Sequence, residues 1–417
     1  MILEERMAKI FPFKAVRPSA EYADIIPALP YDVYSRKEAK EVVKKSPHSF
    51  LAIDRPETQF DDDFDMYSDA CYQKAADMLH EWTFEGSLIK EKTDCYYVYE
   101  LTMAGRSQTG IVACASIDDY ISNVIKKHEN TRKEKEEDRV RHVDTCSAQT
   151  GPIFLAYRES ADIKSVVSKI KSGSCIYDFT KEDEVRHRVW IVDNTDDINT
   201  IKNSFEEMDS IYIADGHHRC ASACRVGMMR REAFPGYTGD EEFNKFLCVL
   251  FPDEELKILD YNRVVKDLNG YSKEEFIEKL HDIFEINEPA EEEICPKDKG
   301  YVSMYLDGQW YEMKMKDKVL NNDPVNGLDV AILQNNVLAP ILNIKDPTTD
   351  NRIDFVGGIR GLKELKRRVD DNCKVAFAMY PTNISELFAV ADAGLLMPPK
   401  STWFEPKLRS GIFIHEI

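Results

Sequence analysis

The stretch Ile211-Tyr212-Ile213-Ala214-Asp215-Gly216-His217-His218-Arg219 carries the most structural information in this chain. Its first residues are apolar or aromatic and predict a buried strand, which ends at a sharp turn around Gly216. A helix is predicted from about His217 onward. Strand-like and helical segments alternate on both sides of this turn, between about residues 153 and 251. We therefore predict an α+β fold with mixed sheets.

The turn also combines several groups that bind anions. Gly216 permits close approach of the backbone to a ligand, and the amides that open the following helix form its positive end. Arg219, His217 and His218 add donors, and Asp215 supplies a carboxylate that could hold Mg²⁺ or orient a hydroxyl. These residues predict a turn that handles phosphate. The alternative is that Asp215 caps the helix and that the histidines either lie on the surface or only support the residues that contact a ligand.

A second candidate site is the pair His128-Glu129, followed by Asn130, Thr131 and Arg132. A carboxylate beside an imidazole and several cations has the composition of a general base for a weakly acidic hydroxyl. The pair opens a very highly charged segment, 126–143, which is also typical of a solvated helix face. Local chemistry leaves both interpretations open.

A third candidate is the loop Met397-Pro398-Pro399-Lys400-Ser401-Thr402. Its prolines stiffen a segment that presents one ammonium and two hydroxyl groups. Such a loop could bind phosphate or carboxylate, and a basic surface turn is the alternative. The segment Pro30-Tyr31-Asp32-Val33 is too short to interpret by itself.

Periodicity, caps and turn residues predict the remaining elements. Ser35 with Glu38, and Ser272 with Glu275, form capping boxes. Gly105 and Asp307-Gly308 mark hairpin turns. The predicted helices are 36–45, 64–83, 162–171, 196–207, 272–284, 327–335, 360–369 and 384–392. The predicted strands are 96–102, 110–117, 153–157, 189–192, 211–214, 246–251, 301–306, 309–314 and 375–380.

Composition narrows the function classes. The chain has 417 residues, a hydrophobic fraction of 43% and a formal charge of −20, which describe a globular and strongly acidic protein. The charge disfavours nonspecific binding to nucleic acid or anionic membranes. No apolar run reaches the roughly 20 residues of a membrane helix, and the first residues lack a signal-peptide pattern. We expect a cytoplasmic protein with three regions, 1–120, 121–255 and 256–417.

Several motifs, taken in order, resemble a bacterial and archaeal family designated a domain of unknown function (DUF1015) and described as ParB-like. The resemblance covers nearly the whole chain. The motifs are Arg17-Pro18, Pro30-Tyr31-Asp32-Val33, His128-Glu129-Asn130-Thr131-Arg132 with Glu137-Asp138-Arg139, Gly151-Pro152-Ile153-Phe154-Leu155, Ala214-Asp215-Gly216-His217-His218-Arg219 and Met397-Pro398-Pro399-Lys400-Ser401-Thr402.

That family is similar, through three short motifs, to free-serine kinases of the ParB/sulfiredoxin superfamily. The resemblance implies a nucleotide-binding core of that type at 121–255, with additional α/β elements on either side, the last of which contributes the Pro-Lys-Ser-Thr loop. It implies phosphorylation of free L-serine or a similar hydroxy amino acid, with ATP or ADP and Mg²⁺ as cofactors. Implied partners are the nucleotide and the small substrate, without nucleic acid or membrane, and the oligomeric state stays open.

The same resemblance assigns roles to single residues. Glu129 would accept the proton of the serine hydroxyl, and Asp215 and His218 would face the serine and the transferred phosphoryl group, with Asp215 also holding the metal. The implied nucleotide-binding residues are Gly216, His217, Arg219 and His128. The implied substrate-binding residues are Lys400, Ser401 and Thr402.

Two other groups of the superfamily resemble this sequence less closely at the turn. Sulfiredoxins carry a cysteine where this chain has His217, so the attacking thiol is missing. ParB-type CTPases carry Gly-Glu-Arg-Arg at the turn, followed by a basic DNA-binding domain, whereas the segment after this turn contains acidic runs such as 291–293. The alternative function that remains is a nucleotide-binding, ParB-like regulator without kinase turnover.

Overall fold

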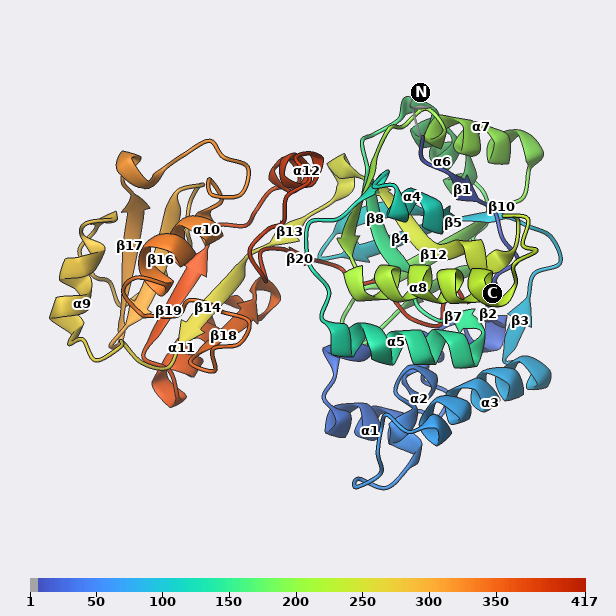
Figure 1. Ribbon diagram of the computed structural model, residues 1–417, viewed down its shortest axis with the longest axis horizontal. Coiled ribbons are helices and arrows are strands. Elements are labelled where there is room, and N and C mark those ends of the chain that lie inside the picture. The colour runs from blue at the N-terminus through green and yellow to red at the C-terminus, as the bar shows by residue number, and fades with distance from the viewer. Residues whose placement is uncertain (1–6) are drawn as a thin grey trace. The chain divides into compact units, whose positions relative to one another are not determined.

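The computed structural model describes residues 7–417 and divides them into two compact units (Figure 1). The first unit contains the chain up to Leu256 together with Pro406–Ile417, and the second is Lys257–Glu405. This division differs from the three expected regions at residue 120. Strands from both sides of that position pair within one sheet, so they share a hydrophobic core and no boundary falls there.

The first unit is built on a nine-stranded mixed sheet with the order β6-β11-β8-β12-β5-β4-β10-β9, in which β1 also pairs with β5. β11 runs parallel to β6 and antiparallel to β8, and β12 runs parallel to β8. The strands are β1 (Ile10–Phe11), β4 (Tyr96–Met103), β5 (Arg106–Ser116), β6 (Ile125–Lys126), β8 (Ile153–Tyr157), β9 (Tyr177–Thr180), β10 (Arg186–Val192), β11 (Ile211–Asp215) and β12 (Lys245–Pro252).

Helices and short strand pairs complete this unit. The α-helices are α1 (Arg36–Lys45), α2 (Leu51–Asp54), α3 (Asp69–Glu85), α4 (Ile117–Ile121), α5 (Lys133–Cys146), α6 (Ala161–Lys171), α7 (Thr195–Phe205) and α8 (His217–Ala233). The 3-10 helices are η1 (Ala20–Tyr22), η2 (Tyr31–Val33), η3 (Pro56–Gln59), η4 (Glu242–Asn244) and η5 (Asp253–Glu255). β2 (Val16–Pro18) pairs with β3 (Leu88–Lys90), and β7 (Ala148–Gln149) with β21 (His415–Glu416).

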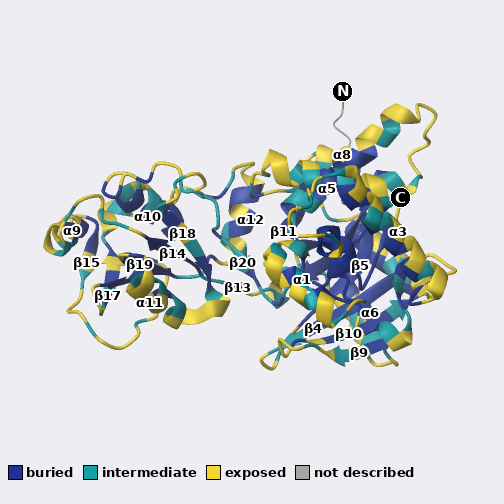
Figure 2. Cartoon of the chain, turned by 90° about the horizontal axis from the view of Figure 1, so that it is seen from below, coloured by how far each residue is buried: buried dark blue, intermediate teal, exposed yellow. Residues whose placement is uncertain are grey.

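Apolar side chains divide the first unit into two cores. The larger core joins the central strands to α6, α7 and α8, and those strands are coloured as buried in Figure 2. A second core gathers α1, α2 and α3 around Phe50 and Trp82. Between the two, α5 packs against α8 on one side and α3 on the other, as Figure 1 shows. The helix that follows the Gly216 turn, α8, therefore lies between α5 and the central strands of the large sheet.

The end of the chain is an integral part of the first unit. Val16 and Ile414 exchange two main-chain hydrogen bonds of 3.0 and 2.8 Å, and Ala28 and Ser410 exchange another pair. These contacts hold the 406–417 segment across the unit. They also bring Lys407 next to the Gly216 turn, a proximity that no sequence spacing indicates.

The second unit has an antiparallel six-stranded sheet, in the order β15-β17-β16-β19-β14-β18. Its core is centred on Tyr305 and Trp310. The strands are β13 (Ile258–Leu259), β14 (Tyr261–Val265), β15 (Phe284–Ile286), β16 (Tyr301–Leu306), β17 (Gln309–Met315), β18 (Ile353–Gly357), β19 (Val375–Met379) and β20 (Trp403–Phe404). The helices are α9 (Lys273–Leu280), η6 (Asp317–Val319), α10 (Asp329–Leu333), the π-helical turn η7 (Gln334–Leu338), η8 (Gly358–Arg360), α11 (Gly361–Asp371) and α12 (Ile384–Asp392).

The local sequence signals are confirmed. Both capping boxes form, at Ser35 before α1 and at Ser272 before α9. Both hairpin turns form, and Asp307-Gly308 has positive φ at both positions, as a tight hairpin requires. Mixed sheets with surrounding helices confirm the α+β class. Within residues 7–417, every helix is too short or too polar to cross a membrane.

The helix predicted over 64–83 begins later than expected, and the charged segment 126–143 is helical over only part of its length. The charged segment is helical only from Lys133, because Ile125–Lys126 pairs with β11 and the residues between form a loop. The helix predicted from 64 begins at Asp69, since the Asp65 carboxylate accepts the amide of Tyr67 and holds a turn. In both places the residues before the helix form a polar loop.

Candidate functional site

The turn at residues 214–219, here called the Asp215 turn, joins β11 to α8. Gly216 lies at φ +93°, in the left-handed region that favours glycine. A Cβ at this position would lie 3.2 Å from Nε and Nη2 of Arg219. Because the guanidinium folds back over Gly216, the glycine is required both by the backbone angle and by close packing.

Asp215 is held by contacts from two directions. Its Oδ1 accepts the amide of Gly216 at 2.8 Å, and its Oδ2 accepts the ammonium of Lys407 at 2.9 Å. Burial by itself would raise the pKa of Asp215, but the charges of Lys407 and Arg219 outweigh it, so the pKa lies well below the usual range. Asp215 is therefore ionised and fixed in position.

His128 and His217 meet beside this carboxylate. His128 lies just beyond β6, and His217 is the first residue of α8, so the parallel pairing of β6 with β11 brings them together. Their rings stand edge to face with centroids 4.5 Å apart, and both side chains are buried. Burial lowers the pKa of His128 to about 4 and that of His217 well below 6.5. Both rings are neutral at physiological pH.

Glu129 extends this pair into a three-residue cluster. One ligand atom from each of His128, Glu129 and His217 lies within 4.8 Å of the others. Glu129 is half-buried, whereas the two imidazoles are not accessible. The second predicted site is thus part of the first, although the two segments are far apart in sequence.

His218 ties the loop after Glu129 to the turn. Its Nε2 accepts the amide of Arg132 at 2.9 Å. Thr131, one residue earlier, donates its hydroxyl to Glu136 on α5 at 2.9 Å. These two contacts fix the loop between β6 and α5, so Glu129 has a defined place relative to α8.

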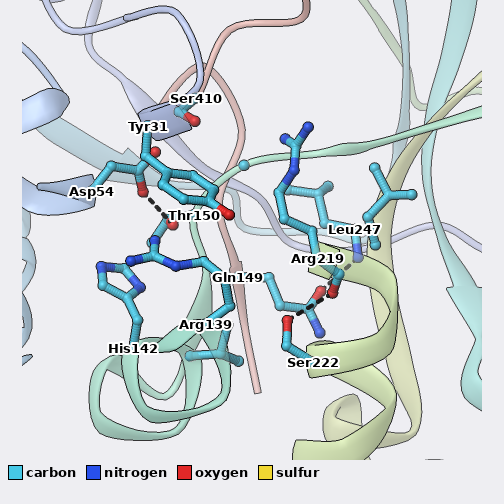
Figure 3. Close-up of a pocket in the computed structure, with 13 residues that line it drawn as sticks. Tyr31, Asp54, Arg139, His142, Gln149, Thr150, Arg219, Ser222, Leu247 and Ser410 are labelled. Atoms are coloured by element: carbon cyan, nitrogen blue, oxygen red, sulfur yellow. Dashed lines mark hydrogen bonds between the residues drawn. The ribbon is translucent and has the colours of Figure 1, made fainter. Parts of the chain in front are cut away.

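A small cavity of about 30 Å³ lies beside Arg219 (Figure 3). Arg219 donates from Nη1 to the carbonyl of Pro152 at 2.7 Å, and the Thr150 hydroxyl donates to Asp54 at 2.8 Å. The cavity has room for ordered water but not for a nucleotide. Its lining residues are Tyr31, Asp54, Arg139, His142, Val143, Gln149, Thr150, Gly151, Ile153, Arg219, Ser222, Leu247 and Ser410.

A larger cavity of about 310 Å³, here called the Arg139 cavity, lies between α5 and the segments around η2 and η3. This volume is in the range of small-molecule sites. Tyr31 and Arg139 line both cavities, so they form the partition between them. The lining residues are Tyr31, Asp32, Tyr34, Arg55, Pro56, Glu57, Met66, Tyr67, Tyr72, Glu134, Lys135, Asp138 and Arg139.

Paired charges build the walls of the Arg139 cavity. The Arg139 guanidinium lies 4.1 Å from the centre of the Tyr31 ring and contacts the Asp138 carboxylate at 2.9 Å. Asp138 also accepts the hydroxyl of Tyr72 at 2.8 Å. Burial is the main cause that raises the pKa of Tyr31 to about 12, so its phenol is neutral.

The sequence does not predict the Arg139 cavity. The segment 30–33 is too short to interpret, and Glu137-Asp138-Arg139 carries a signal only as part of a family motif. The available signal was that both segments recur in the same family pattern as the Asp215 turn. Arg55, which donates to the carbonyls of Tyr31 and Tyr34, had no sequence signal.

The third predicted site lies in the second unit and is described with it. Lys400 has φ +59°, and its ammonium lies 5.5 Å from the centre of the Tyr261 ring. Ser401 is buried and donates its hydroxyl to the carbonyl of Pro398 at 2.6 Å. Thr402 is half-buried. The loop is therefore fixed within its own unit, with the Ser401 hydroxyl occupied internally.

These features define an α+β protein whose strand–turn–helix element gathers buried imidazoles, two carboxylates and an arginine. The family described as "Protein of unknown function (DUF1015)" matches residues 10–331, and the chain belongs to that family. No curated protein matches the sequence.

Several solved structures are distantly similar. SbnI with a C-terminal truncation, from Staphylococcus aureus, has 12% identity and a TM-score of 0.38, over 70% of this chain and 82% of that chain. A free serine kinase in complex with AMP has 14% identity and a TM-score of 0.35, over 73% and 91%. A conserved hypothetical protein from Pyrococcus furiosus has 14% identity and a TM-score of 0.33, over 73% and 94%.

Proposed function

We propose that the protein is a nucleotide-dependent kinase that phosphorylates the hydroxyl of free L-serine or a similar small hydroxy amino acid. The observation that carries the proposal is the convergence of Glu129 and the Asp215 turn at the start of α8. A candidate base and a candidate phosphate site thereby lie next to each other, although they are far apart in the sequence. Phosphoryl transfer needs this combination, since it depends mainly on positioning and electrostatic stabilisation.

The phosphate side of the site is the first turn of α8. The first helical hydrogen bond runs from the amide of Cys220 to the carbonyl of Gly216, so the preceding amides lie at the free positive end of the helix. Gly216 lets phosphate oxygens approach the backbone, and Arg219 adds a planar guanidinium beside them. In this proposal His217 contributes its main-chain amide, because its ring is buried against His128.

The acceptor side uses the two carboxylates. The serine hydroxyl oxygen attacks the terminal phosphorus of the nucleotide, the bond from that phosphorus to the bridging oxygen breaks, and Glu129 takes the hydroxyl proton. Asp215, ionised and fixed by Lys407, orients the acceptor together with His218. Oxygen ligands suit Mg²⁺, which would be held by the phosphates and Asp215 and would neutralise charge on the transferring group.

The family resemblance supports the choice of serine and the grouping with the ParB/sulfiredoxin superfamily. The donor is left as ATP or ADP, because the Asp215 turn holds phosphates and no residue identified at the site selects a base.

The test is phosphoserine formation. Purified protein is incubated with L-serine, Mg²⁺ and either ATP or ADP, and the products are read by mass spectrometry. Glu129→Gln is expected to reduce the rate by roughly 10²–10⁴-fold, the contribution of a general base. Its nucleotide affinity should stay unchanged, because the phosphates bind at α8. Glu137→Gln, an exposed change on α5, is the matched control and should keep the wild-type rate.

Two results would contradict the proposal. The serine assignment fails if neither nucleotide yields phosphoserine. If nucleotide binds and none of a panel of hydroxy amino acids is phosphorylated, the protein is instead a nucleotide-binding regulator.

A further inference from the structure

The cluster of His128, Glu129 and His217 contains a buried nitrogen without a hydrogen-bond partner. His217 is 7% exposed, and its Nε2 has no hydrogen-bond partner within the described part of the chain. A buried polar atom left unpaired is costly and rare in folded proteins. His217 also belongs to a group of three residues that each bring one candidate ligand atom to within 4.8 Å of the others. The site therefore has donor atoms in excess of its internal hydrogen bonds.

The donor set matches a known preference of transition metals. Two imidazoles and one carboxylate bind zinc in catalytic sites and other divalent metals in facial triads. Ligand atoms around a tetrahedral zinc lie about 3.4 Å apart, from metal–ligand distances of about 2.1 Å. The three candidate ligand atoms lie within 4.8 Å of one another, so their separations would have to shorten by no more than about 1.4 Å.

The imidazoles are oriented as metal ligands usually are. The His128 ring hydrogen-bonds to the main-chain carbonyl of Ile213, on β11. A hydrogen bond from the second ring nitrogen to a backbone carbonyl is the typical outer-shell contact that fixes a ligating histidine. His217 is anchored by its position at the start of α8, directly after Gly216. Two rigid elements thus hold two of the three donors.

We propose that His128, Glu129 and His217 bind a divalent transition-metal ion of the Zn²⁺ or Co²⁺ type. This ion differs from the Mg²⁺ of the proposed function, because Mg²⁺ prefers an all-oxygen shell and imidazole nitrogen favours zinc-like metals. Metal binding at this site does not depend on any kinase activity.

One corollary does rest on the proposed function. A carboxylate bound to zinc cannot accept the serine proton, so occupancy of this site would inhibit phosphoryl transfer that Mg²⁺ supports. If the protein has no kinase activity, the corollary fails and the binding measurement below is unaffected.

The test is a titration of the metal-free full-length protein with Co²⁺, followed by visible absorption, and with Zn²⁺, followed by calorimetry. The wild type should bind one ion with the spectrum of nitrogen and oxygen ligation. His217→Gln should weaken binding by more than about 100-fold, since even outer-shell changes cost 10–100-fold. His80→Gln, on the exposed surface of α3, is the matched control and should bind as the wild type does.

Glu129→Gln provides a second variant in case His217→Gln fails to fold, because its side chain is half-buried rather than enclosed. It should also weaken Co²⁺ binding strongly. The proposal is overturned if the wild type shows no saturable binding, or if Glu129→Gln binds as tightly as the wild type. A thiolate-to-metal absorption band would also overturn it, by placing the ion on cysteines such as the neighbouring Cys220 and Cys224.

Discussion

The Asp215 turn and the Arg139 cavity are both built from charged and aromatic residues, yet they differ in how those charges are satisfied. At the turn, a carboxylate is paired with Lys407 from the end of the chain, while the Nε2 of buried His217 stays unpaired within the described residues. In the cavity, Arg139 is paired with its sequence neighbour Asp138 and covered by Tyr31. The turn therefore keeps one unpaired polar atom close to its carboxylate, whereas the charged groups of the cavity wall are paired with their neighbours.

The two regions also differ in the volume of the cavity that each contains. The cavity beside the turn holds about 30 Å³, whereas the Arg139 cavity holds about 310 Å³. Tyr31 and Arg139 line both cavities, so they separate the small cavity beside Arg219 from the larger one. A ligand that used both regions would have to move this partition.

The largest effect on stability is expected from Arg139→Ala. This change leaves the Asp138 carboxylate without its cation in a site where both side chains are at most 15% exposed. Removing one partner of a buried pair costs about 3–5 kcal/mol. The free energy of unfolding, measured by urea denaturation, should fall by that amount.

Arg225→Ala is the control for that experiment. Arg225 pairs with Glu137 at 2.8 Å, but both side chains are more than 40% exposed. Loss of such a surface pair should cost less than about 1 kcal/mol. Equal losses for the two variants would show that the Arg139 pair is no more important than a surface contact.

Gly216→Ala is expected to have an intermediate effect. The left-handed backbone costs a residue with a side chain about 1–2 kcal/mol, and the new Cβ would also press on Arg219. Thermal unfolding should shift downward, and nucleotide binding should weaken because the guanidinium is displaced. A variant as stable as the wild type, with unchanged nucleotide affinity, would mean that the turn relaxes without consequence for the site.

Among the three site and cavity variants, the smallest effect is expected from Asp215→Asn, at about 1 kcal/mol. Asp215 retains 37% exposure, so solvent screens its pair with Lys407. The folded state lowers the pKa of Asp215, so the ionised group stabilises the protein above the unfolded pKa of about 3.9. That contribution is lost as the pH falls through the lower folded pKa.

Unfolding measured from pH 7 to pH 3 tests whether the stabilisation by Asp215 decreases as the pH falls. The difference between wild type and Asp215→Asn should be largest at neutral pH and should shrink below about pH 4. A difference that is constant across this range would mean that the ionisation of Asp215 contributes nothing.

Local signals in the sequence were sufficient for most elements of the fold. The capping box of Ser35, the Asp307-Gly308 turn and the strand before Gly216 depend on residues within a few positions of one another. Such short-range preferences act in any tertiary context, so they are visible in one sequence. The sequence did not show that α5 begins only at Lys133. That boundary depends on pairing between Lys126 and Tyr212, which are distant in sequence.

The sequence by itself determined the residue types of the candidate site: a glycine between strand and helix, an acid before it, two histidines and an arginine after it, and a separate His-Glu pair. Only the tertiary structure decided that His128 meets His217, that Lys407 neutralises Asp215, and that Tyr31 and Arg139 enclose a cavity. The physical reason is that these contacts join segments whose separation is set by sheet pairing and burial, and no local preference encodes those distances.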